Sequence, residues 1–320
     1  MFSVFSVVNK YRKEHHGDTE KTEKNAKTFE MTFLLPNAFR VHQWIKNFLV
    51  FVPLLMAHRV FDTHAILRTS YAFVAWCLCA SAVYLMNDLL DLEADREHPR
   101  KKLRPLASGA LNSKTVWLLV PLLLLLAFGI AFLLLPVRFG VSLILYLGLT
   151  TAYSVYLKRI LIVDVLLLAA LYALRVLSGG FAADIPVSPW LLAFSMFLFL
   201  SLAFVKRYAE LRNTEDHTLT RRRYSTQDSE LLKSFGAASG YLSVLVLVLY
   251  INSREVVALY HSPTILWLIG PCLLYWITRM WLLAYRGEMD EDPILFTVKD
   301  WPSYMVGIIV ALVIVVATLF

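Results

Sequence analysis

The chain has 320 residues, of which 58% are hydrophobic and only 17% are charged, and its mean hydropathy is +0.60. A soluble domain carries about 25% charged residues, so this composition excludes an ordinary soluble protein and favours one solvated mostly by lipid. The net charge of +7 is typical of nucleic-acid binders too, but in so apolar a chain it indicates a cytoplasmic membrane face, and we expect no nucleic-acid partner.

The N-terminal 35 residues differ from the rest because they are polar and mix lysines with acidic residues. They lack the apolar core and the small-residue cleavage site of a signal peptide. We therefore expect a disordered cytoplasmic tail over 1–35 and one membrane domain over 36–320.

Nine apolar runs follow, each near the roughly 20 residues that a membrane-spanning helix needs. They cover about 44–60, 70–88, 115–135, 139–157, 161–181, 189–206, 235–252, 263–284 and 301–320. Backbone groups in hydrocarbon must be hydrogen-bonded internally, which helices achieve. The sequence therefore predicts an all-α, polytopic membrane protein of about nine transmembrane helices.

The basic residues indicate the orientation of these spans. Most of the 31 Lys and Arg residues lie in the N-terminal tail and in the loops that follow even-numbered spans. The positive-inside rule places those segments in the cytoplasm. We expect a cytoplasmic N-terminus, a bacterial inner membrane, and an active site that faces the cytoplasm, where the long polar segments 87–114, 207–234 and 285–300 lie.

The second span ends in a group of oxygen-bearing side chains. At about 100° per residue, one quarter of the helix carries four of them, while Glu93 falls on the opposite side. The four are Asn87, Asp88, Asp91 and Asp95. Their carboxylates repel one another, and Mg²⁺ is usually held by one or two carboxylates together with substrate phosphates. This face therefore indicates a metal site.

A basic segment follows immediately and includes Lys102 and Arg104. Acids that hold a metal beside bases that hold phosphate would form a diphosphate site, with Lys102 and Arg104 on the donor. The alternative is a solvated helix end whose acids pair with nearby cations.

The run Asn87-Asp88-x-x-Asp91-x-x-x-Asp95, with Arg104-Pro105 after it, resembles motifs of the UbiA superfamily of intramembrane prenyltransferases. The start of the first span, Gln43-Trp44-Ile45-Lys46-Asn47, is similar too, and the resemblance covers about 36–320. It implies a UbiA-type helix bundle in which Asp88, Asp91 and Asp95 bind catalytic Mg²⁺. It also implies that Asn87 and Lys46 contact the substrate.

The fourth span closes with Lys158 and Arg159, which either anchor a helix end at the interface or contact substrate. The family often has a Tyr-x-x-x-Lys element here, from which this chain departs, since its tyrosines are Tyr153 and Tyr156. By resemblance we expect a catalytic role for Lys158 and substrate binding by Tyr153.

Two charges on the fifth span, Asp164 and Arg175, lie on one helix face about 16 Å apart along the axis. A deep charge in a span faces the bundle interior or a wet cavity, so both are expected to bind substrate or to be buried structural partners. The sixth span ends in Lys206-Arg207, which suits a helix end facing phosphate.

A second Asp-x-x-x-Asp motif, present in many family members after the sixth span, is absent here. This absence and the Asp164/Arg175 span resemble the decaprenyl-phosphate phosphoribosyltransferase branch, in which phosphoribosyl pyrophosphate is the donor and a polyprenyl phosphate the acceptor. The sequence thus predicts a Mg²⁺-dependent transferase that acts on a polyprenyl (di)phosphate and releases diphosphate, by either prenyl or phosphoribosyl transfer. Its partners would be an isoprenoid lipid, a diphosphate-bearing donor and membrane lipid. The alternatives are a transporter and a non-catalytic scaffold.

Overall fold

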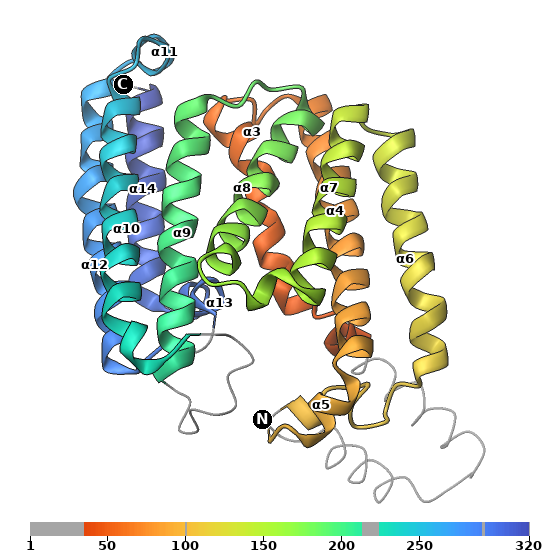
Figure 1. The fold of residues 1–320 in the computed structure, drawn as a ribbon. Coiled ribbons are helices and arrows are strands. Elements are labelled where there is room, and N and C mark those ends of the chain that lie inside the picture. Colours follow the sequence, from red (N-terminus) through yellow and green to blue (C-terminus); the bar gives the residue numbers. More distant parts are fainter. Residues whose placement is uncertain (1–34, 100, 213–223, 290–291, 320) are drawn as a thin grey trace, which may run out of the picture. The chain divides into compact units, whose positions relative to one another are not determined.

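A computed structural model describes residues 35–99, 101–212, 224–289 and 292–319. All regular structure within these ranges is helical, which confirms the predicted all-α class (Figure 1). The chain forms two compact units, one made of Met1–Asn47 and Phe73–Leu134 and the other of Phe48–Ala72 and Leu135–Phe320. Nearly all of the predicted tail over 1–35 lies outside the described residues.

The first unit is built on two long apolar helices, α4 (Thr63–Leu90), whose first ten residues belong to the other unit, and α6 (Ser113–Leu133). Between them lie α5 (Leu92–Glu97) and η2 (Lys101–Leu103). The helix α6 begins where the Asn112 side chain accepts a hydrogen bond from the Lys114 N–H, a standard N-cap. The core of the unit packs apolar side chains of α4 and α6 around Leu106.

The second unit contains the remaining helices. They are α3 (Val52–Met56), α7 (Val137–Val155), η3 (Leu157–Arg159), α8 (Val163–Ala183), α9 (Pro189–Arg212), η4 (Thr226–Asp228), α10 (Ser229–Ile251), α11 (Arg254–Leu259), η5 (Pro263–Leu268), α12 (Ile269–Arg286), α13 (Pro293–Thr297) and α14 (Trp301–Leu319). The central helix α9 packs against both α8 and α10. The main hydrophobic cluster of the second unit lies around Phe199, Phe204 and Trp281.

Small residues allow close helix contacts in the second unit. A Cβ atom on Gly179 would lie 1.9 Å from the backbone oxygen of Val50, so only glycine fits there. The Ser201 hydroxyl donates to the Gly236 carbonyl at 2.7 Å and accepts from the Trp281 indole at 3.1 Å, which joins α9, α10 and α12.

An ion pair joins α12 to the start of α14. Both terminal nitrogens of Arg279 donate to the Asp300 carboxylate, at 2.6 and 2.9 Å. The same carboxylate accepts from the Ser303 N–H and so caps α14. Burial alone would raise the pKa of Asp300, but hydrogen bonds from Arg279 and Ser303 outweigh it and hold that pKa below its ordinary value.

Eight helices of the described chain are long and apolar enough to cross a membrane: α4, α6, α7, α8, α9, α10, η5 with α12, and α14. The ninth predicted span is represented by a shorter apolar helix over Val41–Met56, formed by η1 (Val41–Phe51) and α3. Its exit was predicted near residue 60 and lies at 56, and α4 begins at Thr63 rather than 70. The protein is therefore an integral membrane protein.

Candidate active site

The acidic face predicted at the end of α4 continues into α5. The Asp91 N–H donates to the Asn87 carbonyl at 3.0 Å, and the Asp95 N–H donates to the Asp91 carbonyl at 2.8 Å. These are helical i→i−4 bonds, so Asn87, Asp91 and Asp95 are stacked one turn apart despite the short break at Asp91. Glu93 is exposed.

Two arginines bind the carboxylates of this face. Arg104 Nη1 lies 2.5 Å from Asp95 Oδ2 and 3.2 Å from Asp88 Oδ1. Arg40 Nη2 lies 2.5 Å from Asp88 Oδ1, and its guanidinium lies over the Tyr84 ring. Asp88 and Asp95 are buried, so these cations offset two negative charges that water reaches poorly. Arg104 is predicted to bind phosphate, and in the structure it pairs with the carboxylates of Asp88 and Asp95.

Arg40 is a member of this cluster that sequence reasoning missed. It lies in a left-handed backbone conformation, with φ of 50°, immediately before η1. The segment around it is fixed to α4 because the Ser81 hydroxyl donates to the Phe39 carbonyl and accepts from the Trp44 indole. The signal available in the sequence was an arginine three residues before Gln43-Trp44, at the entry to the first span.

Asn87 provides an unused acceptor beside the acids. Its Oδ1 atom is buried and has no hydrogen-bond partner among the described residues. Buried polar atoms are normally satisfied, so such an orphan indicates a missing donor or cation. The amide oxygen and the three aspartates form an all-oxygen set, which suits Mg²⁺. As the side chains stand, no described group of three or more His, Cys, Asp or Glu residues is arranged around a metal position.

The two predicted lysines of the first unit differ in exposure. Lys46 is 7% exposed on η1, next to Asn47, whose amide donates to Cys77 Sγ. Lys102 lies on η2 with an exposed side chain. Lys102 is therefore placed at the surface of the basic segment, whereas Lys46 belongs to the interior.

In the second unit, three of the predicted residues meet in one buried cluster. Arg207 Nε donates to Asp164 Oδ2 at 2.5 Å, and Arg207 Nη2 donates to the Tyr153 hydroxyl at 2.7 Å. Arg207 Nη1 also donates to Glu210 at 2.5 Å. The side chains of Arg207 and Asp164 are each 1% exposed. Substrate binding is predicted for Tyr153, Asp164 and Arg207, and the structure adds that Arg207 contacts the other two.

Arg175 lies near the middle of α8 and is buried. Its guanidinium packs against the rings of Tyr146 and Tyr172, 5.0 and 5.5 Å from their centroids, and donates to the Leu171 carbonyl at 2.7 Å. Cation–π contacts of this kind stabilise a desolvated arginine. Lys158 is half-buried on η3.

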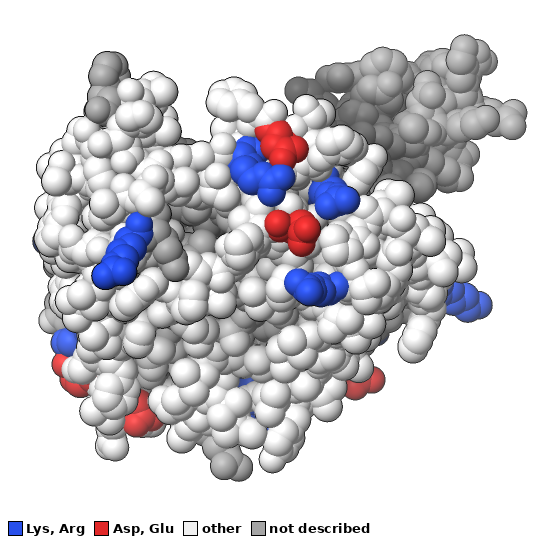
Figure 2. All heavy atoms as spheres, turned by 90° about the horizontal axis from the view of Figure 1, so that it is seen from above, with Lys and Arg blue, Asp and Glu red and all other residues white. Residues whose placement is uncertain are grey.

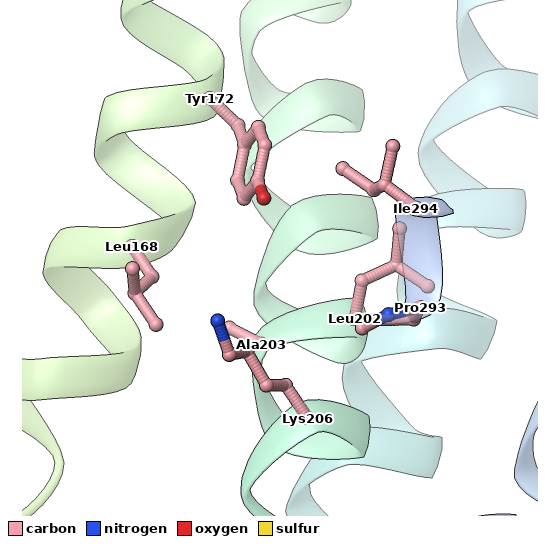
Figure 3. Close-up of a pocket in the computed structure, with 7 residues that line it drawn as sticks. All are labelled: Leu168, Tyr172, Leu202, Ala203, Lys206, Pro293 and Ile294. Atoms are coloured by element: carbon pink, nitrogen blue, oxygen red, sulfur yellow. The ribbon is translucent and has the colours of Figure 1, made fainter. Parts of the chain in front are cut away.

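Lys206 lines a pocket bounded by α8, α9 and α13 (Figure 3). Its ammonium extends from α9 towards α8, where Leu168 and Tyr172 form the opposite wall. Apolar side chains make up the rest of the lining: Leu202, Ala203, Pro293 and Ile294. Among the described residues, Lys206 is thus the one cation in an otherwise mostly apolar lining.

The chain matches the model of the UbiA prenyltransferase family over residues 48–318. It is 38% identical over 283 residues to the uncharacterized protein y4nM of Sinorhizobium fredii, covering 87% of this chain and 54% of that protein, so it spans about half of its length. It is 34% identical over 275 residues to the nodulation protein NoeC of Azorhizobium caulinodans, covering 83% of this chain and 87% of that protein.

It is also 34% identical to the decaprenyl-phosphate phosphoribosyltransferase of Corynebacterium glutamicum over 223 residues, which is 64% of this chain and 66% of that protein. Among solved structures, a UbiA homolog from Archaeoglobus fulgidus bound to GPP and Mg²⁺ matches with a TM-score of 0.66, at 16% identity, over 88% of this chain and 96% of that chain. The sequence motifs, the helical membrane fold and these matches lead to one conclusion: this protein is a transferase that belongs to the UbiA prenyltransferase family.

Proposed function

We propose that this protein is a Mg²⁺-dependent membrane transferase that binds a diphosphate-bearing donor at the acidic face of its first unit and acts on an isoprenoid phosphate. The observation that carries the proposal is the pairing of Arg104 with both Asp88 and Asp95 beside the unsatisfied Asn87 oxygen. Oxygen ligands and guanidinium donors thus lie together, and both are needed to bind a metal-complexed diphosphate.

Asp88, Asp91 and Asp95 would hold the metal, with Asn87 as a further oxygen donor. When bound, Mg²⁺ would neutralise the diphosphate and assist its departure. The arginines then have a second role, because carboxylates that bind a metal release guanidinium donors. Arg40 and Arg104 would move to phosphate oxygens, which planar guanidinium groups bind in bidentate fashion. Electrostatic stabilisation of the leaving diphosphate would be the main catalytic contribution.

The relatives support phosphoribosyl transfer to a polyprenyl phosphate. Proteins named decaprenyl-phosphate phosphoribosyltransferase are 34% identical in Corynebacterium glutamicum and 37% identical over 187 residues in Mycolicibacterium smegmatis. In the second unit, we expect Lys206 to bind the phosphate of the isoprenoid substrate. We also propose that Lys158 and Arg175 contact the substrate, as predicted from the sequence.

The distribution of Lys and Arg along the sequence supports an active site open to the cytoplasm, where soluble diphosphate donors are found. Figure 2, seen from above the view of Figure 1, shows Lys, Arg, Asp and Glu side chains scattered over a mostly uncharged surface.

The decisive experiment compares two reactions of the purified protein with Mg²⁺. One contains phosphoribosyl pyrophosphate and a polyprenyl phosphate, and the other a polyprenyl diphosphate and an aromatic acceptor. We expect release of diphosphate in the first. Release only in the second would assign prenyl transfer, and release in neither would remove the proposed function and favour a scaffold. Solute movement in proteoliposomes that survives Asp91→Asn would favour a transporter.

A further inference from the structure

The start of α8 has an unusual backbone conformation. Ile162, the residue that precedes the first turn of the helix, has φ of 67° and ψ of −39°. A β-branched residue rarely adopts a positive φ, because its side chain is crowded against the backbone there. Such a conformation persists only where the surrounding structure imposes it.

The group that holds Ile162 is Tyr224, from the segment before α10. The Tyr224 hydroxyl accepts a hydrogen bond from the Ile162 N–H at 2.9 Å and donates one to Asp164 Oδ1 at 2.6 Å. The residue is buried, at 7% exposure. Burial and the hydrogen bond to Asp164 raise the pKa of Tyr224 above its ordinary value, so the phenol keeps its proton.

The same carboxylate connects Tyr224 to the end of α9. Asp164 Oδ2 accepts from Arg207, which in turn donates to Tyr153 near the end of α7. The buried cluster therefore fixes both sides of the short connection between α7 and α8. Tyr153 lies before this connection, and Ile162 and Asp164 lie after it.

Lys158 lies between these two fixed points, on η3. The connection is compact, because the Arg159 N–H donates to the Tyr156 carbonyl at 3.1 Å and the Val163 N–H to the Leu161 carbonyl at 2.8 Å. Few backbone conformations satisfy these bonds and the positive φ of Ile162 together. The position of Lys158 thus depends on the bond between Tyr224 and Ile162.

We propose that Tyr224 is a positioning residue that holds the 156–162 turn in the conformation in which Lys158 contacts the substrate. The inference rests on the proposed function for its catalytic consequence, but its structural part stands without it. Tyr224 acts through Lys158 and touches no substrate itself.

The test removes only the hydroxyl, with Tyr224→Phe. Its matched control is Tyr241→Phe, which deletes a hydroxyl that contacts Thr278 at 3.2 Å, between α10 and α12. Tyr224→Phe removes both hydrogen bonds of the hydroxyl, and we expect kcat/KM of diphosphate release to fall about tenfold in this variant and to stay within twofold of wild type in the control. In a Lys158→Ala background, Tyr224→Phe should change the rate less than twofold. Equal losses in both backgrounds would overturn the proposal, because they would show that Tyr224 does not act through Lys158.

A second measurement does not depend on activity. Backbone amide exchange in residues 156–164 should become faster in Tyr224→Phe and stay unchanged in Tyr241→Phe. Unchanged exchange would overturn the inference even if the enzyme is active. Faster exchange in a protein that turns over neither substrate pair would contradict the proposed function alone. If Tyr224→Phe does not fold, Asp164→Asn weakens the hydrogen bond that orients the Tyr224 hydroxyl towards the Ile162 N–H, and it is expected to speed exchange in the same segment.

Discussion

Arg40 and Asp88, 48 positions apart in the chain, form an ion pair with Nη2 2.5 Å from Oδ1. Asp88 is buried, and it belongs to the face proposed to hold Mg²⁺. The pair therefore brings an arginine from outside the acidic motif to the proposed donor site.

Replacing Arg40 should impair donor binding. We expect Arg40→Gln to lower kcat/KM for the diphosphate donor by about tenfold or more, since a hydrogen bond to a charged group contributes about 1.5–3 kcal/mol. Arg59→Gln is the matched control, because Arg59 also pairs with an aspartate, Asp62, but on the surface. Initial rates at varied donor concentration measure the effect. Equal rates for both variants would show that Arg40 has no part in donor binding.

The three aspartates should be individually essential. We expect Asp88→Asn, Asp91→Asn and Asp95→Asn each to reduce turnover at least a hundredfold, because each removes a charged ligand of the proposed metal. Glu93→Gln makes the same chemical change on the exposed opposite side of the helix and should keep near-normal turnover. Normal activity in all three aspartate variants would refute the assignment of the site.

Removal of Mg²⁺ tests the same face independently. Treatment with a chelator should abolish diphosphate release, and added Mg²⁺ should restore it. Weaker metal binding should appear in Asp91→Asn as a higher Mg²⁺ concentration for half-maximal rate. Full activity in excess chelator would be incompatible with the proposed cofactor.

Replacing Gly179, which packs against the backbone of Val50, should lower the stability of the protein. Gly179→Ala places a Cβ in backbone atoms 1.9 Å away, and overpacking of this kind costs about 1–3 kcal/mol. We expect the thermal transition in detergent to fall by several degrees. Gly148→Ala is the control, since nothing lies within 4 Å of its added Cβ, and its transition should be unchanged or higher. Equal transitions in the two variants would contradict the packing seen here.

Two capping aspartates differ in how exposed their ion pairs are, since the Arg279–Asp300 side chains are 20% and 10% exposed and those of Arg59–Asp62 are 44% and 30% exposed. Asp300 pairs with Arg279 and caps α14, whereas Asp62 pairs with Arg59 and caps α4 at the surface. Asparagine still caps a helix, so Asp300→Asn removes mainly the ion pair. We expect a clear fall of the thermal transition at pH 7 for Asp300→Asn and a small one for Asp62→Asn. The reverse order would contradict the lower exposure of the Arg279–Asp300 pair.

The pH dependence of the Asp300 effect has a definite sign. The pKa of Asp300 is lowered in the folded protein, so its pairing stabilises the fold above the ordinary aspartate pKa of about 3.9. That stabilisation is lost as the pH falls through the lowered value. The difference between wild type and Asp300→Asn should therefore shrink on acidification, and a difference that grows would be inconsistent with the lowered pKa.

The sequence predicted the local features of the fold well, because they depend on residues close together in the chain. Hydropathy identified the eight long helices, and the helical repeat placed Asn87, Asp91 and Asp95 on one face. The bounds were less accurate where polar residues belong to a helix, as in the first turns of α4, which carry His64, Arg68 and Thr69.

Long-range partners could not be predicted in this way. The bonds from Arg40 to Asp88 and from Tyr224 to Asp164 join residues 48 and 60 positions apart. Nothing in the spacing of one helix specifies which distant side chain meets its acids. The contact between Tyr153 on α7 and Arg207 on α9 was likewise not predicted, because the tyrosines of this chain depart from the Tyr-x-x-x-Lys spacing and pointed to no such partner.

The 3₁₀ winding of η1 changes the length of chain needed to cross a bilayer. A 3₁₀ helix rises about 2.0 Å per residue and an α-helix about 1.5 Å, so the 16 residues of Val41–Met56 extend about 30 Å rather than 24 Å. That is close to the roughly 30 Å thickness of the hydrocarbon layer. This shorter helix therefore extends far enough to cross the hydrocarbon layer although it has fewer residues than the eight long helices of the described chain.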